Sequence, residues 1–157
     1  MPAKPIPDGY DSLIPYLIVR DAAKAIEFYQ QLFGASEIMR MPYPNSPLLM
    51  HAELKIRSSV FMLTDESANF GQLSPLSLNG QPPVSIMVYV PDVDAVFAKA
   101  SSMGVKAIFP PGDMFWGDRF SKFADPFGHI WCVATHKEDV TPVEMAKRAA
   151  SAFDPVD

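Results

Sequence analysis

The sequence predicts an α+β fold that contains an internal duplication. An apolar strand-like run ending in Asp, then an amphipathic stretch and a Gly, occurs twice in the chain. Asp21 and Asp92 lie 71 residues apart, and Gly34 and Gly104 lie 70 apart, so one register serves both copies. Two β-α-β copies imply a pseudo-symmetric molecule, in which the groove between the copies is the natural place for a binding site.

The length and composition are those of one soluble domain spanning residues 1–157, with a net charge of −5 and 48% hydrophobic residues. Without a Lys/Arg cluster, nucleic acid is not an expected partner. No apolar run reaches the roughly 20 residues of a membrane helix, so no membrane contact is expected either. The start, Met1–Pro7, lacks the apolar segment of a secretory signal and is interpreted as a short extended arm. Together with a lone cysteine, Cys132, this favours a cytoplasmic protein.

The first copy begins with an apolar, β-compatible run at Leu13–Val19. Asp21 can cap a helix whose apolar residues recur at helical spacing until Gly34 stops it. Met50–Ile56 alternates between apolar and polar residues, and Val60–Thr64 follows after a turn, so the two are predicted to form a hairpin.

The second copy follows a stretch of Ser, Asn, Gly, Gln and Pro, which has no periodic pattern and is predicted to be a linker. It repeats the strand, the Asp92 cap and the helix, and then adds a strand at Lys106–Phe109. A loop rich in aromatic residues, Met114–Phe120, precedes short strands around Phe123 and over Ile130–Ala134. Last, Thr141, Pro142 and Glu144 are typical of a capping box and open a helix to about residue 153.

Several segments of the chain together resemble the glyoxalase/bleomycin-resistance/extradiol-dioxygenase (vicinal oxygen chelate) superfamily, in its PhnB-like branch. They are the first strand and helix through Tyr29, His51–Leu54, Phe115–Arg119, Asp125–His129 with Trp131, and Thr135–Asp139. The resemblance implies two βαβββ modules that form a glyoxalase-like eight-stranded cup, with a C-terminal helix added. Their bounds would be about 12–66 and 83–136, with a linker at 67–82 and the helix at about 141–153. It also implies a homodimer.

Metal-dependent members of this superfamily place one ligand on the first and one on the last strand of each module. Carried over to this sequence, the four positions are Ile14, Met62, Ser85 and Cys132. An apolar residue, a thioether, a hydroxyl and one thiol have little affinity for Mg²⁺, Mn²⁺ or Zn²⁺. The sequence therefore predicts neither a metal at this position nor a cofactor.

His51 and Glu53 are the candidate catalytic residues. They lie two apart on one strand and so share the face opposite the apolar one. There they could orient each other for proton transfer or share a metal, or they could simply be a hydrogen-bonded pair in a wet groove, which is the favoured reading.

The remaining candidates are expected to bind a ligand. The aromatic rings of Phe115 and Trp116 next to the cation of Arg119 are suited to holding a small organic molecule, although a lid that only seals the core is an equal alternative. An apolar cup floor is predicted at the vacated metal position and beside it, from Ile14, Tyr16, Met62, Ser85, Met87 and Cys132. Cys132 shows no adjacent base in the sequence, which favours a buried structural thiol over a nucleophile.

These observations favour a protein without the usual metal that binds a small organic ligand. The alternative is a lyase, isomerase or dioxygenase-type enzyme with a displaced site near His51 and Glu53. A methyltransferase acting on demethylubiquinone receives little support, because no Gly-rich loop follows the first strand to hold a nucleotide-like cofactor. Neither the ligand nor the occurrence of catalysis follows from the sequence.

Overall fold

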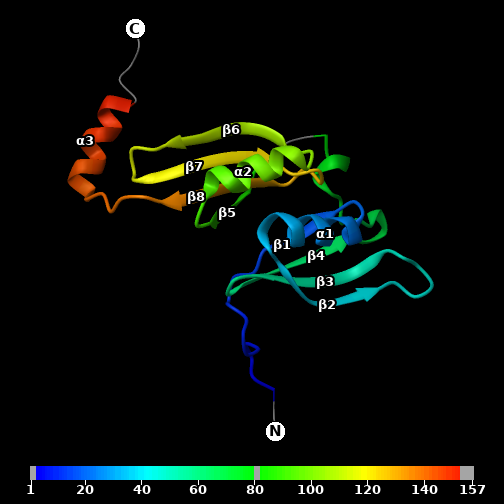
Figure 1. Cartoon of the computed structure of the whole chain (residues 1–157). Helices are drawn as coiled ribbons and strands as arrows, with labels where there is room; N and C mark the ends of the chain where they lie inside the picture. The colour runs from blue at the N-terminus through cyan, green and yellow to red at the C-terminus, as the bar shows by residue number, and fades with distance from the viewer. Residues whose placement is uncertain (1–2, 80–81, 153–157) are drawn as a thin grey trace. The chain divides into compact units, whose positions relative to one another are not determined.

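The computed structural model describes residues 3–79 and 82–152, which form two compact units (Figure 1). The first unit extends to Pro83 and includes Pro126–His129, and the second comprises Val84–Asp125 and the chain from Ile130 onward. The first contains β1 (Tyr16–Val19), α1 (Ala22–Phe33), β2 (Ser36–Pro42), β3 (Leu49–Ile56) and β4 (Ser59–Asp65). The second contains β5 (Ser85–Tyr89), α2 (Val93–Ser102), β6 (Lys106–Asp113), β7 (Asp118–Ala124), β8 (Ile130–His136) and α3 (Pro142–Ala152). The segment between β4 and β5 forms two short 3-10 helices, Ala68–Phe70 and Pro75–Ser77.

The two units have the same topology. The strand order is β1-β4-β3-β2 in one sheet and β5-β8-β7-β6 in the other. In each, the first strand pairs in parallel with the last, and the other neighbours are antiparallel. Both units are therefore βαβββ modules, and the predicted glyoxalase-like α+β fold with a C-terminal helix is confirmed.

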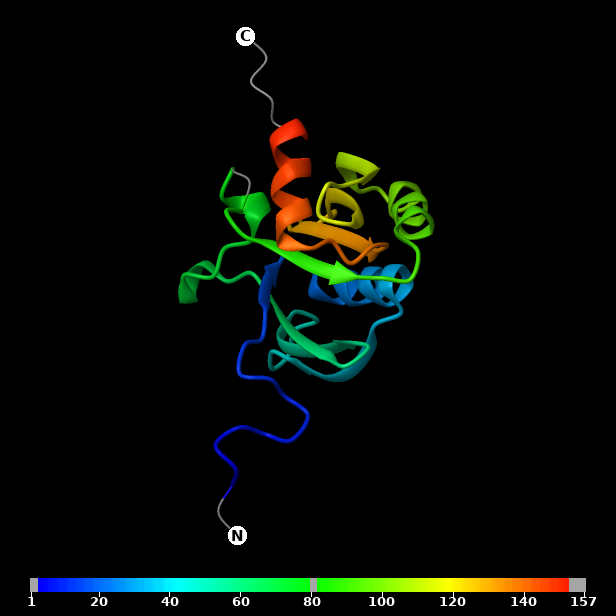
Figure 2. The same cartoon turned by 90° about the vertical axis from the view of Figure 1, so that its left-hand side faces the viewer.

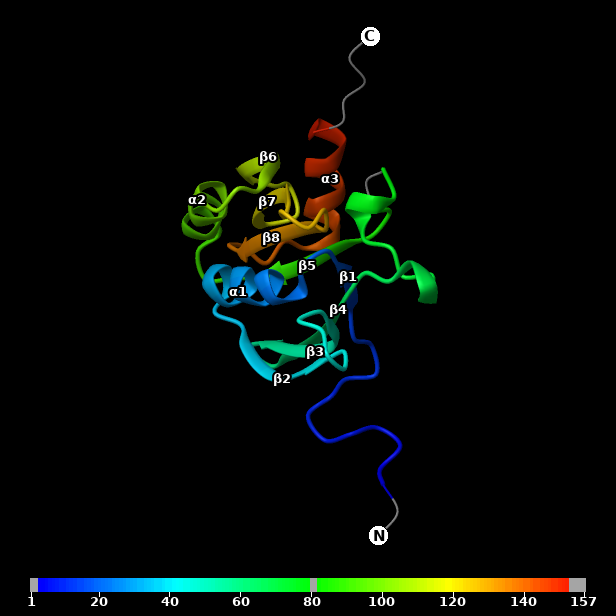
Figure 3. The same cartoon turned by 90° about the vertical axis from the view of Figure 1, so that its right-hand side faces the viewer.

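The helix caps follow the sequence prediction. Asp21 accepts a hydrogen bond from the backbone N–H of Lys24, and Asp92 accepts one from that of Ala95. These side chains satisfy N–H groups of the first turn that have no partner inside the helix. The helix α1 then packs on one face of β2, β3 and β4 (Figure 3), and its apolar residues are buried there. The helix α1 leaves the opposite face of this sheet uncovered.

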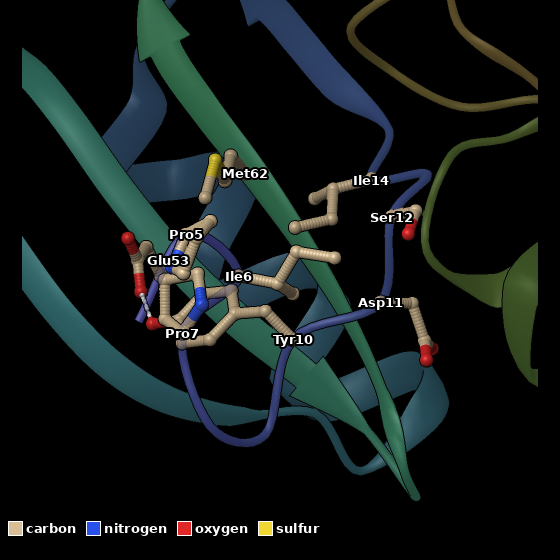
Figure 4. A pocket seen from close by; sticks show the side chains of 9 residues that line it. All are labelled: Pro5, Ile6, Pro7, Tyr10, Asp11, Ser12, Ile14, Glu53 and Met62. Carbon is tan, nitrogen blue, oxygen red and sulfur yellow. Dashed lines mark hydrogen bonds between the residues drawn. The ribbon is translucent and has the colours of Figure 1, made fainter. Parts of the chain in front are cut away.

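That opposite face carries a row of side chains across the first sheet. The strand register aligns Tyr16 with Met62, Met62 with Glu53, and Glu53 with Met39, so the row crosses β1, β4, β3 and β2. Residues aligned in this way project to the same side of a sheet. The N-terminal arm leads into β1 (Figure 2), and its residues lie beside Glu53 and Met62 of this row (Figure 4).

The structure corrects several predicted boundaries. The first strand begins at Tyr16 rather than Leu13, and β6 continues through Pro110 to Asp113. The predicted aromatic loop is wrong at its end, because Asp118–Phe120 already belongs to β7 and only the turn before it is irregular. The strand β2 was implied by the resemblance alone, since its mostly exposed residues lack a clean alternation.

Residues 126–129, between β7 and β8, complete the core of the first unit. The ring of Phe127 contacts those of Phe28 and Tyr29, with centroids 5.9 and 6.2 Å apart. The His129 Nε2–H donates to the carbonyl oxygen of Ile18 at 2.9 Å. His129 therefore has a structural role in this turn.

Candidate functional site

A cavity of about 490 Å³ lies within the first unit, between the N-terminal arm and the sheet face that α1 leaves uncovered (Figure 4). Its walls are mostly apolar, and its polar groups are two carboxylates and two hydroxyls. The arm supplies most of the wall, and Glu53 and Met62 supply the sheet side. The lining residues are Pro5, Ile6, Pro7, Tyr10, Asp11, Ser12, Ile14, Glu53 and Met62. Ligand pockets are typically concave and apolar with a few placed polar groups, and this cavity fits that description.

Glu53 fixes the arm to the sheet. Its side chain projects from β3 toward the cavity and is only 9% exposed. The hydroxyl of Tyr10 donates a short hydrogen bond to Glu53 Oε2 across 43 positions of sequence. The arm is thereby held over the row of Met62 and Glu53, as Figure 4 shows.

The hydrogen-bond chain continues from Glu53 along the sheet. His51 Nε2 lies 2.9 Å from Glu53 Oε1, and His51 Nδ1 lies 2.9 Å from the hydroxyl of Tyr16. Because an ionised carboxylate only accepts hydrogen bonds, His51 Nε2 is assigned as the donor to Glu53. In the tautomer with its proton on Nε2, Nδ1 accepts a hydrogen bond from the Tyr16 hydroxyl. Tyr10, Glu53, His51 and Tyr16 therefore form one connected chain.

The electrostatics of this chain keep Glu53 ionised and Tyr16 protonated. Burial alone would raise the pKa of the Glu53 carboxyl, but hydrogen bonds from His51 and Tyr10 outweigh burial and lower it. Burial raises the pKa of the Tyr16 hydroxyl, and the nearby Tyr43 and Glu53 raise it further. The pKa of Tyr10 is raised by its hydrogen bond to Glu53. At neutral pH Glu53 is therefore ionised, and the two tyrosine hydroxyls keep their protons.

A second cavity of about 300 Å³, also within the first unit, begins at the Tyr16 end of this hydrogen-bond chain. Tyr16 belongs to the hydrogen-bond chain and also lines this cavity. The other lining residues are Ile18, Leu73, Pro75, Leu78, Pro82, Pro83 and His129. The hydrogen-bond chain therefore joins a group in the first cavity, Glu53, to a group at the wall of the second.

The second unit has its own buried carboxylate, Asp118. It accepts hydrogen bonds from the hydroxyl of Tyr89 at 2.8 Å, from the indole N–H of Trp116 at 3.0 Å and from His136 Nδ1 at 2.8 Å. The other ring nitrogen of His136 bonds Asp139, which precedes α3. His136 therefore links Asp118 to the segment that precedes α3.

The structure divides the predicted site residues between the units. Ile14, Tyr16, His51, Glu53 and Met62 belong to the first unit, and all of them line one of its cavities or take part in the hydrogen-bond chain. The predicted ligand-binding residues of the second unit are Ser85, Met87, Phe115, Trp116, Arg119 and Cys132. Their ligand-binding role stays a prediction.

Two of these residues have partners that the sequence did not indicate. The guanidinium of Arg119 binds the carboxylates of Asp94 and Asp113. Trp116 donates to Asp118 and places its ring against Phe115 and Phe120, with centroids 5.0 and 5.9 Å away.

The four positions carried over from metal-dependent relatives do not form a fitting donor set. The register places Met62 beside Tyr16 and Cys132 beside Met87, which agrees with their equivalent positions in the two modules. Ile14 and Met62 face the first cavity, and Cys132 is buried. Within residues 3–79 and 82–152, no group of three or more His, Cys, Asp or Glu is arranged to hold a metal ion. The donor chemistry therefore does not fit a hard divalent cation.

Tyr10 and the arm residues around it are the part of the site that sequence reasoning missed. The arm was predicted to be extended, but not to form a wall of a cavity. The sequence signal for this contact is Tyr10 itself, an aromatic residue within a stretch rich in Pro, Gly and Asp. That signal does not specify a hydrogen bond to Glu53, 43 residues away.

Comparison with known proteins identifies the superfamily. The model of the Glyoxalase/Bleomycin resistance protein/Dioxygenase superfamily matches residues 11–133. An uncharacterized protein of Mycobacterium bovis is 38% identical over 146 residues, covering 91% of this chain and 95% of that protein. In the described part of the chain, no helix is both long and apolar enough to cross a membrane.

Solved structures show the same fold. A Pseudomonas aeruginosa protein matches with a TM-score of 0.66 and 26% identity, over 80% of this chain and 98% of that one. A putative 3-demethylubiquinone-9 3-methyltransferase, the PhnB protein of Bacillus cereus, matches at 0.61 and 22%, over 80% and 99%. The fosfomycin resistance protein FosX of Listeria monocytogenes, complexed with Mn(II) and sulfate, matches at 0.62 and 20%, over 88% and 97%.

The matched family model covers both modules except for the last residues of β8, and the duplicated βαβββ topology is the one that these structures share. This chain belongs to the glyoxalase/bleomycin resistance protein/dioxygenase superfamily.

Proposed function

We propose that this protein binds a small organic molecule in the cavity between the N-terminal arm and the first sheet, without the usual metal of the superfamily. The cavity itself is the observation that carries the proposal. It has the size of a small-ligand pocket, apolar walls and one buried carboxylate, Glu53, to orient a ligand. Its donors do not suit a metal, so binding rests on apolar burial and hydrogen bonding.

A neutral aromatic alcohol, 4-phenylbutan-1-ol, is a suitable probe of this cavity. Met62 lines the cavity, so its methyl group, labelled with ¹³C and assigned with Met62→Leu, reports occupancy by NMR. Saturable shifts of this methyl are expected. Ile6→Ala removes apolar wall and should weaken the probe by about 1 kcal/mol, or roughly fivefold.

Leu13→Ala is the matched control, because Leu13 lies in the same arm but is 88% exposed and outside the lining. It should leave the affinity unchanged. An unchanged Met62 resonance at saturating probe, or equal losses in the two variants, would contradict binding at this place.

A second candidate function is proton transfer on a carbonyl compound, and the chain from Tyr16 through His51 to Glu53 favours it. Such a chain can move a proton from the wall of one cavity toward the other. The ordinary pKa values of Tyr16 and Glu53, 10.0 and 4.5, make that movement uphill by about 7 kcal/mol, and the directions of both shifts add to the cost. This cost is the reason that binding ranks first.

Deuterium exchange tests the second candidate. In D₂O, wild-type protein should catalyse exchange of the C–H protons next to the carbonyl of hydroxyacetone, followed by NMR. His51→Gln interrupts the chain and should abolish the excess rate, while Lys55→Gln on the same strand should retain it. Equal rates with and without the protein would remove this candidate.

The homodimer and the cytoplasmic location remain part of the proposal. Proteins of this superfamily are often dimeric and commonly bind small ligands, which supports the first. We also propose that Phe115 and Trp116 contribute ligand contacts, as the sequence predicts, and that the four carried-over positions hold no metal. Elemental analysis of protein purified without chelator is the measurement for the last point.

A further inference from the structure

The polar lining of the arm cavity has one sign of charge. Glu53 and Asp11 are carboxylates, and Tyr10 and Ser12 contribute hydroxyls. Among the described residues, no Lys, Arg or His side chain lines this cavity. The arm carries one cation between residues 3 and 14, Lys4, and its ammonium is paired with Asp8 at 2.7 Å.

The charge of Glu53 is shielded from water but not neutralised by a permanent cation. Its side chain is 9% exposed, and its pKa is lowered, so it is ionised at neutral pH. Within the described chain, its hydrogen-bond partners are the hydroxyl of Tyr10 and the ring of His51. A buried carboxylate contributes a negative potential to the space that it faces, and Glu53 faces the cavity.

The carboxylate also has room for a further donor. Tyr10 uses Oε2 and His51 uses Oε1, while an ionised carboxylate offers about four acceptor positions. An ammonium group can add to one of these positions or replace the Tyr10 hydroxyl. In either case the ring of Tyr10 remains in the lining, where an aromatic face attracts a cation.

We propose that the arm cavity selects an organic amine that is protonated at neutral pH, with a modest apolar body, and that it rejects anions. This inference rests on the proposed ligand-binding function and names the chemical class of the ligand. The apolar body contacts Ile6, Ile14 and Met62, and the ammonium contacts Glu53.

Three probes of one shape separate charge from apolar contact: 4-phenylbutylamine, 4-phenylbutan-1-ol and 4-phenylbutyrate. Their affinities for the full chain are measured by titration calorimetry at pH 7 and confirmed by the Met62 methyl signal. The ammonium and the Glu53 carboxylate carry opposite charges and attract each other in a place shielded from water, whereas the alcohol is neutral. The amine should therefore bind about tenfold tighter than the alcohol. The carboxylate should bind more weakly than the alcohol.

Glu53→Gln keeps the shape of the side chain and removes its charge. It should lower the affinity of the amine to that of the alcohol and leave the alcohol unchanged. Glu27→Gln is the matched control, since Glu27 is exposed on α1 of the same unit and makes the same change in net charge. It should keep the tenfold preference.

Tyr10→Phe provides a second variant should Glu53→Gln fail to fold. It frees an acceptor position on Glu53 and keeps the charge, so the preference for the amine should persist or increase. Equal affinities of amine and alcohol for the wild type, or a preference lost in Tyr10→Phe, would overturn the inference and leave the ligand-binding function standing. If none of the three probes binds, both the preference for an amine and the proposed ligand-binding function are contradicted.

Discussion

In the second unit, Gly117 occupies a backbone position that has no space for a side chain. It lies in the turn before β7 with a φ of +99°, and a Cβ built there would stand 2.1 Å from the carbonyl oxygen of Glu138. That close approach exists because the N–H groups of Lys137 and Glu138 both donate to the Gly117 carbonyl. These two backbone hydrogen bonds therefore fasten the segment leading to α3 to this turn.

Gly117→Ala should consequently destabilise the protein. Positive φ and the clash with backbone together predict a loss of about 2 to 3 kcal/mol in the free energy of unfolding, measured by denaturant titration. Gly112→Ala serves as the control, because its Cβ would meet the ring of Phe109 at 3.5 Å and the carbonyl oxygen of Pro110 at 3.9 Å, both ordinary contacts. Similar losses in both variants would contradict this explanation.

His136 predicts a pH dependence of stability. Hydrogen bonds to Asp118 and then Asp139 raise the pKa of its imidazole above the ordinary 6.5. A raised pKa in the folded state means that the stabilisation is fully present below about pH 6.5 and is lost as the pH rises through the raised value. The pairing of the imidazolium with two carboxylates should therefore be strongest in mild acid.

The measurement is the difference in melting temperature between wild type and His136→Gln, at about pH 5.5 and about pH 9. The difference should be larger at the lower pH. A difference that is constant or grows toward alkaline pH would show that His136 acts only through packing.

At the scale of elements, Glu66 holds the segment after β4 in place. Its carboxylate accepts hydrogen bonds from the hydroxyls of Ser77 and Ser74, from the Ser74 backbone and from Arg20. These donors lower the pKa of Glu66 to about 2. The 3-10 helix at Pro75–Ser77 is thus tied to the end of the sheet.

Glu66→Gln should lower the free energy of unfolding at pH 7. The lowered pKa corresponds to at most about 3 kcal/mol, and the partial exposure of Glu66 reduces the expected loss to about 1 to 2 kcal/mol. The stabilisation is present above the ordinary pKa of 4.5 and is lost as the pH falls toward 2. Acid titrations followed by circular dichroism should show less stability loss in the variant over this range. Identical acid profiles would contradict the prediction.

The elements differ in how far the sequence predicts them. The helices and their Asp caps were predicted because capping and helical spacing are local, and Thr141 indeed accepts a hydrogen bond from the Glu144 N–H. The strand β2 was implied by the family resemblance but could not be predicted from its own residues, since they are mostly exposed and carry no alternating pattern. In the site, the shared face of His51 and Glu53 follows from strand periodicity, but Tyr10 reaches Glu53 through a fold of the arm that no local rule encodes.

At the scale of the whole molecule, the proposed homodimer has an observable consequence. Several large apolar side chains are exposed on the strands, among them Tyr16, Met39, Met41, Met87 and Tyr89, and exposed apolar patches commonly mark association surfaces. Light scattering coupled to gel filtration should give a mass twice the 17.3 kDa of the chain. Met41→Lys should shift the equilibrium toward monomer, whereas Leu13→Lys in the arm should not. A mass of one chain at high concentration would contradict the homodimer.

Residues 126–129 give the duplicated chain an order of assembly on the ribosome. Because Phe127 contacts Phe28 and Tyr29, the core of the first unit lacks one of its aromatic rings until most of the second unit has been translated. A fragment that stops at Pro83 would contain all strands of the first sheet and still leave those two rings partly uncovered. The two halves repeat each other in sequence, but the first cannot finish folding during synthesis before its successor is nearly complete.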